Sequence, residues 1–106
     1  LASGLLTGKY KRGTAAPADT RFAKAPALKD RYVTARNEDI VEKLQAFAQA
    51  RGHTMLELAF SWLAARPQVS SVIAGATRVE QVEQNVKAIG WSLSAEEMAE
   101  VDQITK

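Results

Sequence analysis

Residue types that build special sites are missing or scarce in this sequence of 106 residues, which has no cysteine and a single histidine, His53. Without cysteine there is no disulfide and no thiolate metal site, and one histidine cannot assemble a His-rich metal site. No apolar run approaches the roughly 20 residues of a membrane-spanning helix. We therefore expect no metal centre and no membrane contact.

A large excess of charge of one sign is also absent. Fourteen Lys and Arg residues face 12 Asp and Glu residues, for a net charge of +2, and the two signs are interspersed along the chain. Nucleic-acid binding usually shows as a basic patch or stripe, and no continuous one is present. We expect no nucleic-acid partner. A DNA-binding helix-turn-helix around Arg51 to His53 is also excluded, because residues 55–65 are too apolar for a helix that lies in a groove.

Hydrophobic periodicity and capping residues predict three helices in the second half of the sequence. One covers Asn37 to about Arg51, with Gly52 as its stop, and a second starts at Thr54 through a capping box with Glu57 and ends at Arg66-Pro67. A last helix covers residues 94–105 and starts with another capping box, formed by Ser94 and Glu97. His53, just before the second helix, is interpreted as a surface turn residue.

The most informative stretch runs from Ser71 to Asn85. Residues 70–74 are β-branched or small and apolar on both faces, which predicts a strand buried in a parallel sheet. Gly75 then leads into a helix whose first turn carries Arg78. Unpaired N–H groups at a helix start attract anions, and an arginine can grip a phosphate through two parallel hydrogen bonds. The pattern favours a phosphate site.

The helix after Arg78 also has polar residues at helical spacing. Gln81, Gln84 and Asn85 could read a planar heterocycle, which suggests a nucleotide rather than a bare anion. A structural interpretation competes, because Thr77 and Glu80 match a capping box and an arginine at a helix start is usually only solvated. The expected apolar stripe of this helix leaves the polar residues off the core; it consists of Val79, Val82, Val86 and Ile89.

A single confident strand does not make a sheet. A strand buried on both faces needs parallel neighbours, and the rest of the chain offers none, so we expect these residues to be part of a larger α/β domain. Either a doubly wound sheet or a (β/α)₈ barrel would fit. The chain also opens without Met in a loop-like segment, residues 1–10, so we expect further residues upstream.

Three segments in this order resemble the C-terminal third of an aldo-keto reductase, a (β/α)₈ barrel. Residues 1–10, Leu-Ala-Ser-Gly-Leu-Leu-Thr-Gly-Lys-Tyr, are similar to the family's loop over the cofactor pyrophosphate. Thr54 to Trp62 resembles the helix before the last strand, and Val72 to Asn85 the eighth strand with the adenosine-phosphate clamp. Residues 11–36, expected to be a long surface loop, match least well. The resemblance thus implies an incomplete TIM barrel with its last strand and clamp at residues 70–90.

The resemblance also implies NADP as cofactor and assigns residues to it. Leu1, Ala2, Ser3 and Lys9 would contact the pyrophosphate or nicotinamide side, and Arg21 the pyrophosphate. The 2′-phosphate and its ribose would be held by Gly75, Ala76, Thr77 and Arg78, and the adenine by Gln81, Gln84 and Asn85. Lys9 and Arg21 have an alternative interpretation as solvated loop charges.

The family's catalytic Asp, Tyr, Lys and His all precede the segment that this chain resembles, so it is expected to contain no catalytic residue. Tyr10 and Tyr32 are not the catalytic tyrosine. When intact, the protein is expected to be a cytoplasmic NADPH-dependent reductase of a small-molecule carbonyl, this chain supplying the clamp. The remaining barrel would come from upstream residues or a partner chain. A non-catalytic cofactor-binding module, like the channel β-subunits, is the alternative.

Overall fold

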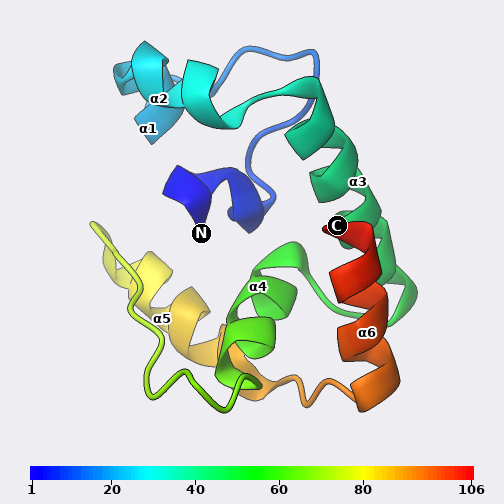
Figure 1. Cartoon of the computed structure of the whole chain (residues 1–106). Helices are drawn as coiled ribbons and strands as arrows, with labels where there is room; N and C mark the ends of the chain where they lie inside the picture. The colour runs from blue at the N-terminus through cyan, green and yellow to red at the C-terminus, as the bar shows by residue number, and fades with distance from the viewer.

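The computed structural model describes all 106 residues and consists of helices joined by turns and extended segments (Figure 1). The 3₁₀ helix η1 covers Ala2–Thr7. The α-helices are α1 (Arg21–Lys24), α2 (Pro26–Tyr32), α3 (Ala35–Ala50), α4 (Met55–Ala64), α5 (Val79–Lys87) and α6 (Ala95–Ile104), and the 3₁₀ helix η2 (Ala88–Gly90) follows α5. None of these helices has the length and hydrophobicity that crossing a bilayer requires.

The main core lies where α3, α4 and α6 meet. Its buried side chains are Leu44, Phe47, Ala48, Met55, Leu58 and Val101. The three helices start at Thr34, Thr54 and Ser94, whose hydroxyl oxygens each accept the backbone N–H three residues on. These caps satisfy N–H groups that the helices leave unpaired. Local capping and apolar burial therefore agree in this part of the molecule.

A second, smaller cluster joins the N-terminal segment to the start of α3. It consists of Leu5 from η1, Phe22 from α1 and Val41 from α3. Tyr10 stacks on Phe22 with ring centroids 4.4 Å apart, and Tyr32 also stacks on Phe22, with ring centroids 6.4 Å apart. Residues 11–36, expected to be one long loop, therefore include two short helices held by an aromatic stack.

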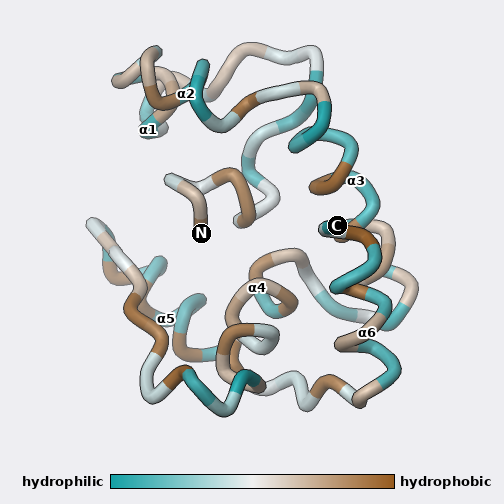
Figure 2. Tube along the Cα trace, in the orientation of Figure 1, coloured by the Kyte–Doolittle hydropathy of each residue, from teal (hydrophilic) through white to brown (hydrophobic).

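The predicted parallel strand and the α/β class are wrong for this structure, which contains helices and no strand. Residues 71–76 are extended but pair with no other segment, and the Ile73 side chain is 97% exposed. A strand is defined by hydrogen bonds to a neighbour, and nothing else in the chain forms one. Figure 2 shows this hydrophobic stretch running along the outside of the helices, beside α5.

The apolar stripe of α5 also differs from the expectation. Its residues are largely open to solvent, with exposed fractions of 71% at Val79, 52% at Val82 and 70% at Val86, and Ile89, which lies in η2, is 51% exposed. Gln81 and Asn85 are half-buried instead. The helix is amphipathic, as the sequence indicates, but the rest of this chain leaves most of its apolar side uncovered.

Candidate functional site

The region predicted to hold the adenosine phosphate lies at the start of α5. Arg78 is the N-cap residue of this helix, fully on the surface, with no side-chain cap. The predicted capping box of Thr77 and Glu80 does not form. The backbone N–H and hydroxyl of Thr77 instead donate to Gln81 Oε1, at 2.7 and 3.2 Å. The Gln81 side chain thus binds the residue before the N-cap and leaves the N–H groups of the first turn without a side-chain cap. Arg78 has no carboxylate within 4 Å.

Backbone donors precede Arg78. The N–H groups of Gly75 and Ala76 make no hydrogen bond within the chain, and both residues are exposed. Two free N–H groups, a guanidinium and the positive end of a nine-residue helix lie within four consecutive positions. This combination attracts an anion. Gln84 is exposed on the next turn of α5, and Asn85 lies half-buried on the side of an apolar groove that also includes Val82 and Val86.

The N-terminal site residues adopt an unusual backbone. Ala2 and Ser3 both have positive φ, 49° and 56°, and Gly4 follows at 102°. Left-handed conformations are costly for residues with a Cβ and cluster at functional sites. The Lys9 side chain passes over Gly4, where an added Cβ would lie 2.8 Å from Lys9 Cε. The lack of a side chain at Gly4 thus leaves room for the lysine directly after Ala2 and Ser3.

The loop before α1 approaches the start of α5. The Lys24 ammonium, hydrogen-bonded to Asp19 at 2.6 Å, and more weakly the Arg78 guanidinium hold the pKa of the Asp19 carboxyl below its ordinary value. Asp19 is two residues from Arg21, which is exposed at the start of α1. The Asp19 carboxyl is therefore close enough to the Arg78 guanidinium to feel its charge. In Figure 1 the N-terminus lies near the middle of the molecule, between α2 and α5.

His53 was predicted to be a simple turn residue, but the structure gives it two partners. Its ring stacks on Trp91 with centroids 4.0 Å apart and planes 9° from parallel. His53 Nδ1 lies 2.5 Å from a carboxylate oxygen of Glu57. This contact, helped by a hydrogen bond from the backbone of Thr54, holds the pKa of Glu57 below its ordinary value. The sequence pattern of Thr54 and Glu57 indicated a capping box, so the contact of the Glu57 carboxylate with His53 was not predicted.

Arg12 was also overlooked. It comes from the poorly matching loop and contacts three carboxylates on the first turns of α3: Asp39 at 2.6 Å, and Glu38 and Glu42 at 3.4 Å each. The hydrogen bond to Asp39 is the main cause of a raised pKa of Arg12. The spacing of the acids, which puts Glu38 and Glu42 on one helix face, is the signal in the sequence that indicates a basic partner.

Comparison with known proteins assigns the family. The sequence model of the aldo/keto reductase family matches residues 1–106. The chain is 41% identical to the L-glyceraldehyde 3-phosphate reductase of Escherichia coli K12, over 97% of the chain and 31% of that protein. It is 43% identical to a probable voltage-gated potassium channel subunit beta of Arabidopsis thaliana, over 84% of the chain and 27% of that protein. It spans about a third of the length of these curated relatives, and it belongs to the aldo/keto reductase family.

Proposed function

We propose that this chain supplies the cofactor-binding part of an NADPH-dependent oxidoreductase that reduces aldehydes or ketones to alcohols. The observation that carries the proposal is the exposed Arg78 at the start of α5, preceded by the free N–H groups of Gly75 and Ala76. An anion-binding helix start with one unpaired arginine suits the 2′-phosphate that distinguishes NADPH from NADH. Family membership and the similarity to the E. coli reductase support the same activity.

The roles within this proposal follow the chemistry of each group. Arg78 and Thr77 would hold the 2′-phosphate, together with the backbone of Gly75 and Ala76. Gln81 would exchange its bonds to Thr77 for the adenosine, beside Gln84 and Asn85. The turn of Leu1, Ala2 and Ser3 would lie against the pyrophosphate or nicotinamide side, with Lys9 and Arg21 as its cations. NADPH, when bound, supplies the hydride for carbonyl reduction.

The catalytic acid is proposed to come from outside this chain. In support of this proposal, the Tyr10 hydroxyl accepts the backbone N–H of Phe22, and the rings of Tyr10 and Tyr32 both stack on Phe22. The uncovered apolar side of α5 and the unpaired segment 71–76 support a surface completed by further residues of the same polypeptide or by a partner chain. Those residues would also bring the carbonyl substrate.

The test compares the two cofactors. In the complete polypeptide that contains this chain, Arg78→Ala should weaken NADPH binding about 10- to 150-fold and leave NADH binding nearly unchanged, because a charge-assisted contact is worth about 1.5–3 kcal/mol. Asn85→Ala should weaken both cofactors alike, since adenine is common to them. Fluorescence titration measures the four affinities, and Lys87→Ala, at the other end of α5, is the matched control. Equal losses of NADPH and NADH in Arg78→Ala would contradict the role of Arg78.

A second candidate is a cofactor-binding module without turnover. The specific observation in its favour is the 43% identity to the plant channel subunit beta, which is as high as the identity to the reductases. The two functions differ in one measurement. Oxidation of NADPH by a panel of aldehydes in the complete polypeptide favours the reductase, whereas tight NADPH binding with no turnover of any aldehyde favours the module.

A further inference from the structure

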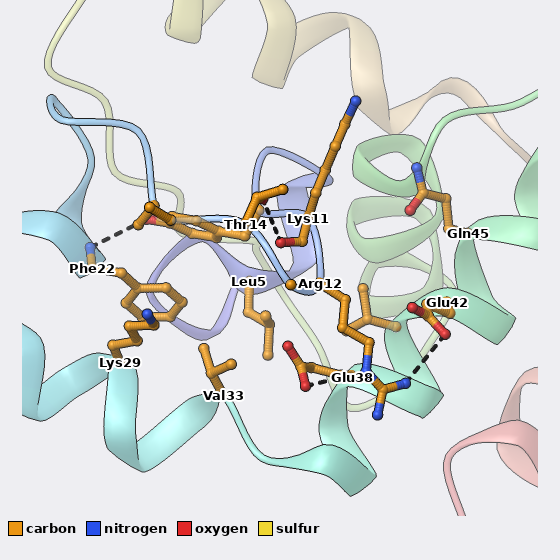
Figure 3. A pocket seen from close by; sticks show the side chains of 15 residues that line it. Leu5, Lys11, Arg12, Thr14, Phe22, Lys29, Val33, Glu38, Glu42 and Gln45 are labelled. Atoms are coloured by element: carbon orange, nitrogen blue, oxygen red, sulfur yellow. Dashed lines mark hydrogen bonds and ion pairs between the residues drawn. The ribbon is translucent and has the colours of Figure 1, made fainter.

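The largest cavity of the molecule is lined mainly by side chains that already have partners in the fold. It has a volume of about 570 Å³ and lies between residues 11–16, α1, α2 and the first half of α3 (Figure 3). Its apolar wall includes the small buried cluster described above, and Figure 3 shows the carboxylates of Glu38 and Glu42 held by Arg12. A set of donors suited to an anion lies elsewhere, directly before α5.

The Gln81 side chain occupies two of these donors. Its amide oxygen Oε1 accepts the backbone N–H of Thr77 at 2.7 Å and the Thr77 hydroxyl at 3.2 Å. Because a backbone N–H can only donate, the amide must present its oxygen to Thr77. The NH₂ group of Gln81 makes no hydrogen bond within the chain. Both donors of Thr77 are therefore engaged by a single neutral oxygen.

The donors of Thr77 also suit a phosphate. Gly75 and Ala76 have unpaired N–H groups beside them, and Arg78 has no carboxylate within 4 Å. A phosphate oxygen that takes the hydrogen bonds of Thr77 must first displace Gln81 Oε1. Hydrogen bonds to a charged acceptor are roughly twice as strong as neutral ones, so a phosphate can win this exchange. Its apparent affinity is nevertheless lowered, because the donors are free in only a fraction of the molecules.

The exchange needs only a local movement. Gln81 is the third residue of α5 and is half-buried, whereas Thr77 and Arg78 are exposed. Neither hydrophobic cluster includes Gln81, so its side chain can rotate without disturbing the core. A glutamine at the third helical position often reaches back to the start of the helix, as in a capping box, so the contact with Thr77 is a favourable resting position.

We propose that Gln81 is a specificity-determining residue that makes this region select a phosphate attached to adenosine over a simple phosphate. The proposal rests on the cofactor role proposed above. A simple phosphate releases the Gln81 amide into water, so each bond that it gains from Thr77 replaces one that the amide already made. A 2′-phosphate on adenosine also brings an adenine, whose ring nitrogens and amino group can bind the released amide. Competition by Gln81 therefore weakens simple phosphates more than the cofactor.

The test compares inorganic phosphate with 2′-AMP in the complete polypeptide that contains this chain. Gln81→Met keeps the length of the side chain and removes its oxygen, so it should strengthen binding of inorganic phosphate about 2- to 10-fold, as expected for one neutral hydrogen bond. Binding of 2′-AMP should gain less or become weaker, because the adenine loses the amide. Competition with NADPH, followed by fluorescence, measures the affinities. Gln103→Met, exposed on α6, is the matched control and should change neither affinity.

A second measurement does not depend on the cofactor. Without added anions, the Thr77 N–H should exchange with solvent more slowly in the parent than in Gln81→Met, because the bond to Gln81 Oε1 protects it. NMR measures this exchange. Equal exchange rates, or an unchanged phosphate affinity in Gln81→Met, would overturn the role of Gln81 even where the parent binds 2′-AMP well. No binding of 2′-AMP by the parent would contradict the proposed function and, with it, the selection by Gln81.

Discussion

Two parts of this molecule contain amphipathic helices, but they differ in how much of the apolar side is buried. The α3, α4 and α6 region and the segment of residues 70–90 both contain amphipathic helices, but only the first buries its apolar side. Leu58 on α4 is 2% exposed, whereas Val86 on α5 is 70% exposed. Helices in proteins gain most of their stability from packing an apolar face rather than from propensity. The comparison shows that an apolar stripe indicates which side of a helix can be buried, but not which segment will cover that side.

The largest difference in the free energy of unfolding is expected between a substitution in the main core and one on the apolar stripe of α5. Leu58→Ala should lower the free energy of unfolding of the chain by about 2–5 kcal/mol, because it leaves a cavity in the main core. Val82→Ala, at a position that is 52% exposed, should change it by no more than about 0.5 kcal/mol. Urea unfolding followed by circular dichroism measures both.

Leu58→Met keeps the volume and is the control for the core position, with an expected cost below about 1.5 kcal/mol. A loss in Val82→Ala as large as that in Leu58→Ala would break the comparison. It would mean that the stripe of α5 is covered in solution, for example by a second copy of the chain.

Removing a helix cap should also lower the free energy of unfolding more in the packed region than at the start of α5, but the difference should be smaller. Ser94 forms a complete capping box with Glu97, so Ser94→Ala should cost about 1 kcal/mol of stability. Thr77→Ala removes only the contact with Gln81 at the uncapped, exposed start of α5 and should cost no more than about 0.5 kcal/mol. Ser94→Asp, which keeps a capping oxygen, should stay close to the parent in the same unfolding measurement.

The smallest effect is a pH dependence confined to the packed region. His53 lowers the pKa of Glu57 from its ordinary 4.5, so the carboxylate stabilises the folded state fully above the unfolded pKa. That stabilisation should disappear as the pH falls through the lower, folded pKa of Glu57. Unfolding between pH 6 and about pH 3 should therefore show a weaker loss for Glu57→Gln than for the parent, whereas Glu83→Gln, exposed on α5, should follow the parent. Identical pH profiles of Glu57→Gln and the parent would contradict the role of the His53 contact.

Local signals in the sequence predicted much of the packed region. The capping residues Thr54 and Ser94 and the 3.6-residue periodicity indicated helices close to where α4 and α6 lie, and periodicity alone indicated α3, whose cap, Thr34, was not predicted. These features act over one or two turns. The same reasoning could not find the stacking of His53 on Trp91, or the three carboxylates around Arg12. These contacts join residues 38 and about 30 positions apart in the sequence.

The sequence by itself determined the family, the caps of α4 and α6 and the amphipathic nature of α5, because motifs, caps and periodicity are properties of neighbouring residues. Only the tertiary structure decided that residues 70–74 form no strand, that the apolar side of α5 is largely open to solvent, and that Arg12 lies against three carboxylates of α3. A strand needs a hydrogen-bonding neighbour and a buried face needs a surface to cover it. Both depend on which segments meet in space, and local sequence does not contain that information.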